Sequence, residues 1–218
     1  SVRSLSKSEK VIAIIKKEVD PKDNLEFCEL DLLSDDGWED AMKGCEFVLH
    51  VASPFIIFEP KDENEYIRPA VDGTMRALKA AKKAGIKRVV LTSSMVSMLG
   101  DADKSVDINF ESWTNVNAKN VSAYAKSKTL AEKAAWDFIR AQTDAKPMEL
   151  SVVNPGPVYG PTLSGDLSGA SMGMFKQIMS GKMPMVAQAA INMSDVRDIA
   201  KIHVLALENE NSNGKRFI

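Results

Sequence analysis

Short apolar runs alternate with longer amphipathic segments along most of the chain. The apolar runs have the length of strands, as at Phe47–Ala52, Arg88–Thr92 and Leu150–Val153. The longer segments repeat apolar residues at helical spacing, as at Glu65–Ala84 and Ser122–Gln142. Because parallel strands need helical crossovers and are buried on both faces, this order predicts an α/β fold with a parallel sheet covered by helices on both sides.

Weaker signals complete the series of expected elements. Ser6 and Glu9 have the spacing of a capping box ahead of a helix that contains Val11–Ile15. Further strands are expected at Ser1–Arg3, as the tail of a strand, at Leu25–Leu30 and at Lys215–Ile218, and further helices at Asp36–Met42, Ser171–Ser180 and Val196–Leu207.

The composition of the chain argues against several classes of function. The 218 residues carry a net charge of −2, with acidic and basic residues mixed, which disfavours a nucleic-acid binder. No apolar run approaches the roughly 20 residues of a membrane span. Cys28 and Cys45 lack metal-ligand spacing and are interpreted as buried free thiols in a reducing cytoplasm. His50 and His203 are too few for a His-rich site, so no metal is expected, and His50 is interpreted as a core histidine.

One common motif does not occur in the chain. A dinucleotide-binding βαβ unit normally has a Gly-rich turn between its first strand and helix. The sequence has no such turn, and it opens where the second strand of that fold would be ending. We therefore expect an internal segment of a longer protein, which by itself would not form a stable cofactor-binding unit; the alternative is a complete but divergent protein.

A candidate proton-transfer unit lies in the middle of the chain. Tyr124 and Lys128 are four residues apart in an expected helix, so their side chains share one face. A cation near a phenol favours the phenolate, and the spacing therefore predicts a lowered pKa for Tyr124. The hydroxyl of Ser94, at the end of an expected strand, would hold a carbonyl oxygen while Tyr124 protonates it. The same spacing also occurs by chance on many helices, so the surrounding motifs must decide between a catalytic pair and a chance pair.

Several further motifs follow one another in a recognisable order. They are His50-Val-Ala-Ser-Pro54, Leu91-Thr-Ser-Ser94, Tyr124-Ala-Lys-Ser-Lys-Thr-Leu-Ala-Glu132, Asn154-Pro-Gly-Pro-Val-Tyr-Gly-Pro161 and Asp195-Val-Arg-Asp198. With them the chain resembles the extended short-chain dehydrogenase/reductases, and within these the dihydroflavonol-4-reductase-like group. That group includes cinnamoyl-CoA reductases and bacterial and yeast carbonyl reductases. The resemblance covers nearly the whole chain.

The resemblance implies catalytic roles for three residues. Ser94 would polarise the carbonyl, Tyr124 would be the acid/base, and Lys128 would hold the nicotinamide ribose and tune Tyr124. Ser93 is the alternative for the serine role, because the two serines are adjacent.

The resemblance also implies a cofactor. Arg3 and Lys10 would lie near an adenosine 2′-phosphate, which favours NADPH over NADH and suits the bidentate fork of a guanidinium. The alternative is that Arg3 and Lys10 are solvated surface charges that do not contact a cofactor. The remaining cofactor contacts implied are Asp31 and Leu32 beside the adenine, Val51, Ala52 and Ser53 along the dinucleotide path, and Pro155 and Val158 at the nicotinamide end.

These implications give a complete hypothesis. Residues 1–160 would form an NADP-binding Rossmann-type domain, doubly wound but without its first βα unit, and residues 161–218 part of a substrate-binding region. The expected reaction is NADPH-dependent reduction of a small-molecule ketone or aldehyde by a cytoplasmic monomer or homodimer. The alternatives are a nucleotide-sugar epimerase or dehydratase, a 3β-hydroxysteroid dehydrogenase-type enzyme, and a non-catalytic dinucleotide sensor.

The apolar residues of the helix expected at Ser171–Ser180 allow two interpretations. They would either line an adaptable substrate pocket, since methionine fills irregular gaps, or simply face the core. The residues concerned are Met172, Met174, Phe175, Ile178 and Met179.

Overall fold

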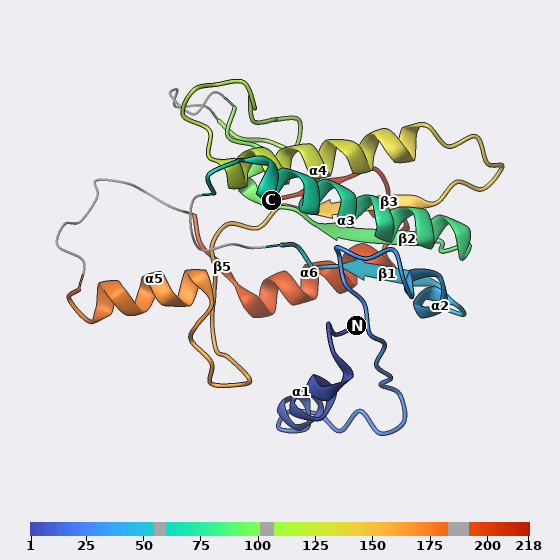
Figure 1. Ribbon diagram of the computed structural model, residues 1–218, viewed down its shortest axis with the longest axis horizontal. Helices are drawn as coiled ribbons and strands as arrows, with labels where there is room; N and C mark the ends of the chain where they lie inside the picture. Colours follow the sequence, from blue (N-terminus) through green and yellow to red (C-terminus); the bar gives the residue numbers. More distant parts are fainter. Residues whose placement is uncertain (55–59, 101–106, 183–191) are drawn as a thin grey trace.

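A parallel sheet forms the centre of the molecule (Figure 1). The structure is a computed structural model that describes residues 1–54, 60–100, 107–182 and 192–218. The strands β1 (Phe47–His50), β2 (Arg88–Thr92), β3 (Glu149–Val153) and β6 (Arg216–Phe217) follow one another in that order across the sheet, all parallel. A separate parallel pair joins β4 (Val158–Tyr159) to β5 (Ser194–Asp195).

The two faces of the sheet bury alternate residues of the same strands. Val89 and Leu91 belong to the larger core cluster, under the helices α3 (Asn64–Lys83) and α4 (Ala123–Arg140). Val90 belongs to a smaller cluster with Ala206 of α6 (Val196–Glu208), on the opposite face (Figure 1). The predicted α/β fold with helices on both faces of a parallel sheet is therefore confirmed.

Local features explain how the covering helices are held. Gly85 follows Ala84, the C-cap of α3, and takes up a left-handed φ of 73°, a conformation that glycine adopts without strain. Arg88 is buried at the start of β2, where its guanidinium donates to the carbonyls of Ala206, Leu207 and Asn209. It thus satisfies backbone acceptors at the C-terminal end of α6 and fixes this helix on the sheet.

The remaining helices are shorter than α3, α4 and α6. They are α1 (Ser8–Ile15), which stands apart from the sheet near the N-terminus in Figure 1, α2 (Trp38–Met42), α5 (Ala170–Met179), and the 3₁₀ turns Leu5–Lys7, Met95–Ser97 and Glu210–Ser212. None of the helices in the described ranges is both long and apolar enough to cross a membrane.

Some expected elements differ from the structure. Leu25–Leu30 forms no strand and contributes only one parallel bridge, between Val2 and Glu29. The capping box is also wrong, because Ser6 lies in a 3₁₀ turn and α1 has no side-chain cap. Cys28 and Cys45 are free thiols, but Cys28 is only partly buried and Cys45 is exposed. The division into residues 1–160 and 161–218 stays a prediction.

Candidate functional site

A cavity of about 700 Å³ opens at the carboxyl ends of β2 and β3. This is the edge of an open parallel sheet where ligands bind in α/β folds. Its walls are formed by Thr92, Ser93, Ser94, Met95, Val96, Leu99, Tyr124, Lys128, Pro155, Gly156, Pro157, Val158, Gly169, Ala170, Ser171, Met172 and Met174. The cavity thus brings together the three predicted catalytic residues and Ser93, Pro155 and Val158.

The helix cap of α4 places the predicted proton donor. Ser122 is the N-cap, and its side chain accepts a hydrogen bond of 3.2 Å from the backbone N–H of Ala125. Tyr124 therefore lies in the first turn of α4, and its side chain is hydrogen-bonded to that of Ser94. Lys128, one turn further along, has its Nζ 5.9 Å from the centroid of the Tyr124 ring.

Burial dominates the pKa values of both titrating groups. It raises the pKa of Tyr124 above its ordinary value, while the hydrogen bond from Ser94 opposes the rise and Tyr66 adds to it. Burial lowers the pKa of Lys128 to about 8, against a raising effect of Glu132. The predicted lowering of the Tyr124 pKa by Lys128 is wrong for this structure, because burial penalises the phenolate more than its surroundings stabilise it.

The two adjacent serines have different partners. Ser93 donates to Oε2 of Glu132 across 2.6 Å, inside the protein. The hydroxyl of Ser94 instead meets the Tyr124 side chain. This geometry favours Ser94 over Ser93 for the carbonyl-binding role, which stays a prediction.

The residues that follow β1 lie near the same site. Ala52 and Ser53 share with Lys128 the walls of a small gap of about 10 Å³ next to the main cavity. Val51 is 57% exposed. It lines neither this gap nor the main cavity.

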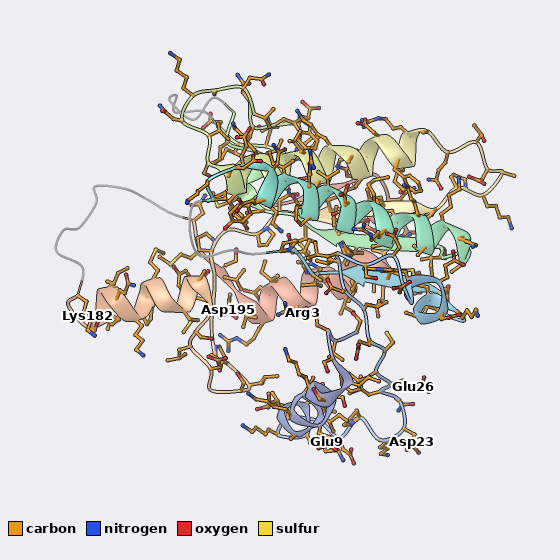
Figure 2. The ribbon with its side chains drawn as sticks, in the orientation of Figure 1. Arg3, Glu9, Asp23, Glu26, Lys182 and Asp195 are labelled. Atoms are coloured by element: carbon orange, nitrogen blue, oxygen red, sulfur yellow. The ribbon has the colours of Figure 1, made fainter. Side chains whose placement is uncertain are left out.

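The expected adenosine contacts lie outside this cavity. Arg3 and Lys10 are exposed on the N-terminal segment, where Figure 2 labels Arg3. Asp31 is exposed and accepts a hydrogen bond of 2.9 Å from the backbone N–H of Leu33. Leu32 packs against the larger core cluster. The structure therefore does not gather these four residues with the catalytic group, and their cofactor contacts stay predictions.

Two residues at or beside the cavity were not among the predicted site residues. A Cβ on Gly156 would lie 2.5 Å from the carbonyl oxygen of Asn192, so this loop position excludes a side chain. Tyr66 of α3, which has the pattern of a core residue, lies edge-on to Tyr124 with ring centroids 6.4 Å apart. Both residues acquire their place at the site only through tertiary packing.

The Met-rich helix α5 divides between two environments. Met172 and Met174 line the main cavity, in agreement with the substrate-pocket reading. Phe175 and Met179 instead line a separate pocket, which Met172 also lines. Ile178 lines neither of these two pockets.

Comparisons with known proteins show what the chain is similar to. The family model described as the NAD dependent epimerase/dehydratase family matches residues 2–218. Cinnamoyl-CoA reductase CAD2 of Medicago truncatula is 31% identical over 100% of the chain and 67% of its own length. The NADPH-dependent methylglyoxal reductase of Saccharomyces cerevisiae is 34% identical over 81% of the chain and 56% of its own length.

A solved structure extends the similarity to the fold. The crystal structure of yeast methylglyoxal/isovaleraldehyde reductase complexed with NADPH superposes with a TM-score of 0.84 at 30% identity, covering 99% of the chain and 68% of its own. The chain spans 56% to 67% of the length of the two curated relatives named above.

Proposed function

We propose that this chain, which belongs to the NAD dependent epimerase/dehydratase family, is the catalytic part of an NADPH-dependent carbonyl reductase. The chain is a member of the dihydroflavonol-4-reductase-like group of extended short-chain dehydrogenase/reductases, as its similarity to plant reductases shows. The substrate would be a small ketone or aldehyde. The observation that carries the proposal is the contact of Ser94 with Tyr124, one helical turn from Lys128, in a cavity at the strand ends.

The raised pKa of Tyr124 suits the direction of reduction. A phenol whose pKa lies above its ordinary value of about 10 keeps its proton at neutral pH. Ser94 would donate a hydrogen bond to the carbonyl oxygen, and Tyr124 would transfer its proton to that oxygen as the O–H bond of the phenol breaks. The Lys128 ammonium would then stabilise the phenolate that remains.

NADPH would supply the hydride to the carbonyl carbon. The residues present fit its nicotinamide end, because the cavity walls combine the apolar side chains of Pro155 and Val158 with the buried amine of Lys128. The relatives support the choice of NADPH, since one is named an NADPH-dependent reductase and another structure is a complex with NADPH.

The test is NADPH oxidation by the full-length protein with a panel of aldehydes and ketones. We expect Tyr124→Phe to lower kcat by roughly 10²–10⁴-fold, the usual contribution of a positioned general acid. Tyr159→Phe is the matched control, because this phenol packs against Phe175 and does not line the main cavity. Turnover near the wild-type level in Tyr124→Phe would refute the mechanism.

A further inference from the structure

Helix α4 carries a third polar residue in line with the two predicted catalytic ones. Tyr124, Lys128 and Glu132 follow one another at intervals of four residues, so they share one face of the helix. Glu132 is fully buried, with 0% of its surface exposed. A buried carboxylate is costly unless it is paired and hydrogen-bonded, so its partners indicate what it is for.

Both oxygens of this carboxylate are fully occupied. Oε2 accepts hydrogen bonds from Ser93 (2.6 Å), Ser97 (2.7 Å) and Asn154 (2.8 Å). Oε1 accepts from Nε of Arg216 (2.6 Å) and more weakly from the indole of Trp136 (3.3 Å).

These partners belong to the segments that build the cavity. Ser93 precedes Ser94, and Asn154 precedes Pro155, which lines the cavity. The single proton of the Ser97 hydroxyl is shared between Glu132 and the backbone carbonyl of Ser94, whose oxygen lies 2.8 Å from the hydroxyl. One carboxylate therefore links α4, the loop after β2 and the loop after β3 at the point where all three meet the site.

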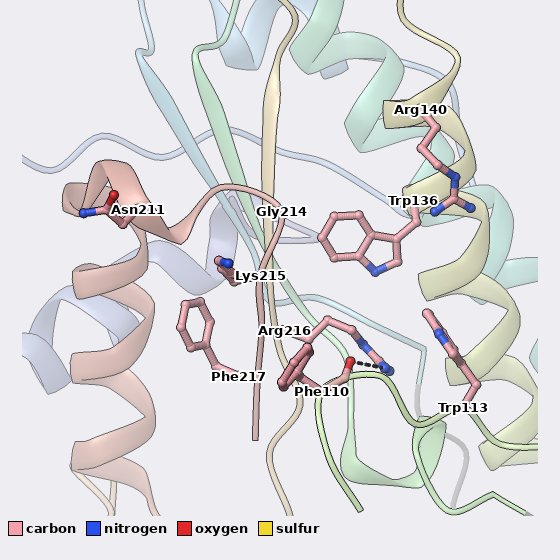
Figure 3. Close-up of a pocket in the computed structure, with 9 residues that line it drawn as sticks. All are labelled: Phe110, Trp113, Trp136, Arg140, Asn211, Gly214, Lys215, Arg216 and Phe217. Carbon is pink, nitrogen blue, oxygen red and sulfur yellow. Dashed lines mark hydrogen bonds between the residues drawn. The ribbon is translucent and has the colours of Figure 1, made fainter.

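Arg216, which pairs with Glu132, is itself held by further contacts, and Figure 3 shows it beside Trp113 and Phe110. Its guanidinium lies 3.9 Å from the centroid of the Trp113 ring, a cation–π contact. It also donates to the carbonyl oxygens of Phe110 (3.0 Å) and Ser112 (2.6 Å). Arg216 is thereby held on two sides, and it fixes the carboxylate of Glu132 in turn.

Resting on the proposed function, we propose that Glu132 is a positioning residue for carbonyl reduction. It would hold the Ser93–Ser94 segment against α4 and keep a negative charge one turn from Lys128. Stability alone is a weak reason for such a group, because well-packed apolar residues often replace a buried ion pair without loss.

The charges around Lys128 determine the expected pH effect. Tyr124 and Glu132 share its helix, and His50 faces it from the end of β1. Tyr66 on α3 acts on Tyr124, and Arg216 on β6 pairs with Glu132. Burial lowers the pKa of Lys128 to about 8 and Glu132 raises it, so neutralising Glu132 lowers that pKa further. The pKa of His50 is about 4, which leaves it neutral in this range.

The decisive variant is Glu132→Gln in the full-length protein. We expect kcat to fall roughly 10- to 100-fold, the cost of displacing catalytic groups by about 1 Å. The basic limb of the pH profile should move to lower pH. Glu149→Gln is the matched control, because Glu149 also pairs with a buried arginine, Arg88, at the opposite ends of the strands. A Glu132→Gln protein that loses thermal stability but keeps the wild-type kcat and pH profile would overturn the proposal.

A second readout needs no turnover. The side-chain NMR signal of Lys128 reports its titration directly, and we expect a lower pKa in Glu132→Gln. An unchanged titration overturns this inference, whereas a wild-type protein that reduces no carbonyl overturns the proposed function. Should Glu132→Gln not fold, Glu132→Asp keeps the charge and withdraws the carboxylate. We then expect a lower kcat with the Lys128 titration retained, and a wild-type kcat would again overturn the proposal.

Discussion

At the scale of single residues, the site shows opposing effects on one phenol. Burial raises the pKa of Tyr124 and its hydrogen bond with Ser94 lowers it, and burial is the larger effect. Spacing along a helix reveals neighbours but not burial, so the sequence predicted the pairing of Tyr124 with Lys128 and the wrong direction for the pKa.

The exposed N-terminal cations allow a test of cofactor choice. We expect the full-length protein to favour NADPH over NADH and Arg3→Ala to reduce that preference. Losing a charge-assisted hydrogen bond costs about 1.5–3 kcal/mol, or roughly ten- to a hundredfold in affinity. The ratio of apparent affinities for the two cofactors is the measurement. Lys16→Ala, which removes another exposed cation of the same segment, should leave the ratio unchanged.

Two outcomes would contradict the predicted role of Arg3 in cofactor binding. One is a wild-type preference for NADH, and the other is a ratio that Arg3→Ala does not change.

Adjacent serines illustrate a further limit of sequence. Ser93 and Ser94 have the same chemistry, and no pattern tells which hydroxyl turns inward. The structure separates them because Glu132, 39 positions away, accepts from Ser93. Glu132 itself was visible only as part of a motif, since its role depends on partners such as Asn154 and Arg216 from distant segments.

At the scale of elements, the long periodic helices and the buried strands were predictable, whereas the short strand expected at Leu25–Leu30 was not found. The helix expected at Glu65–Ala84 spans Asn64–Lys83, because many apolar positions and the terminal Gly85 define it. The run Leu25–Leu30 has suitable strand residues, but a strand needs a neighbour to accept its hydrogen bonds. In the described residues it finds only the bridge of Glu29 to Val2.

The attachment of α6 to the sheet can be tested through Arg88. Its side chain is 2% exposed, pairs with Glu149 and donates to carbonyls at the end of α6. Breaking one side of a buried pair typically costs about 3–5 kcal/mol, so Arg88→Gln should lower the free energy of unfolding by that order. Arg140→Gln is the control, since Arg140 pairs with Asp137 at 67% and 71% exposure. Such surface pairs contribute about 0–1 kcal/mol.

Urea unfolding of the two variants beside the wild type gives the comparison. Equal losses in Arg88→Gln and Arg140→Gln would mean that Arg88 does not anchor the helix.

At the scale of the whole molecule, the faces of the sheet and the ends of its strands have different roles. Its helix-covered faces supply the core, and the carboxyl ends of β1, β2 and β3 supply Ser53, Ser94 and Pro155 to the site. The order of strands and helices was predictable because each has its own period. The strand ends meet at one edge because the strands are parallel. The cavity walls added by α5 could be derived neither from the order of the elements nor from the parallel arrangement.

The buried histidine at the end of β1, His50, is expected to make the stability of the fold depend on pH. Burial, with a smaller contribution from the Lys128 charge, lowers the pKa of His50 from 6.5 to about 4. Between these values the unfolded chain binds more protons than the folded protein, so stability falls as pH falls. The stabilisation is fully present above about pH 6.5 and is lost through pH 4. The shift corresponds to at most roughly 3 kcal/mol.

We therefore expect the full-length protein to lose stability on acidification from pH 7 to 4.5, and His50→Leu to lose less. Thermal or urea unfolding across this range, for both proteins, measures the difference in slope. Lys128→Met provides a second comparison, because removing the nearby charge should bring the His50 pKa up and flatten the dependence in part. If the His50→Leu protein lost stability as steeply as the wild type, the imidazole would not be the group whose protonation opposes folding, and the acid sensitivity would have to come from the carboxylates.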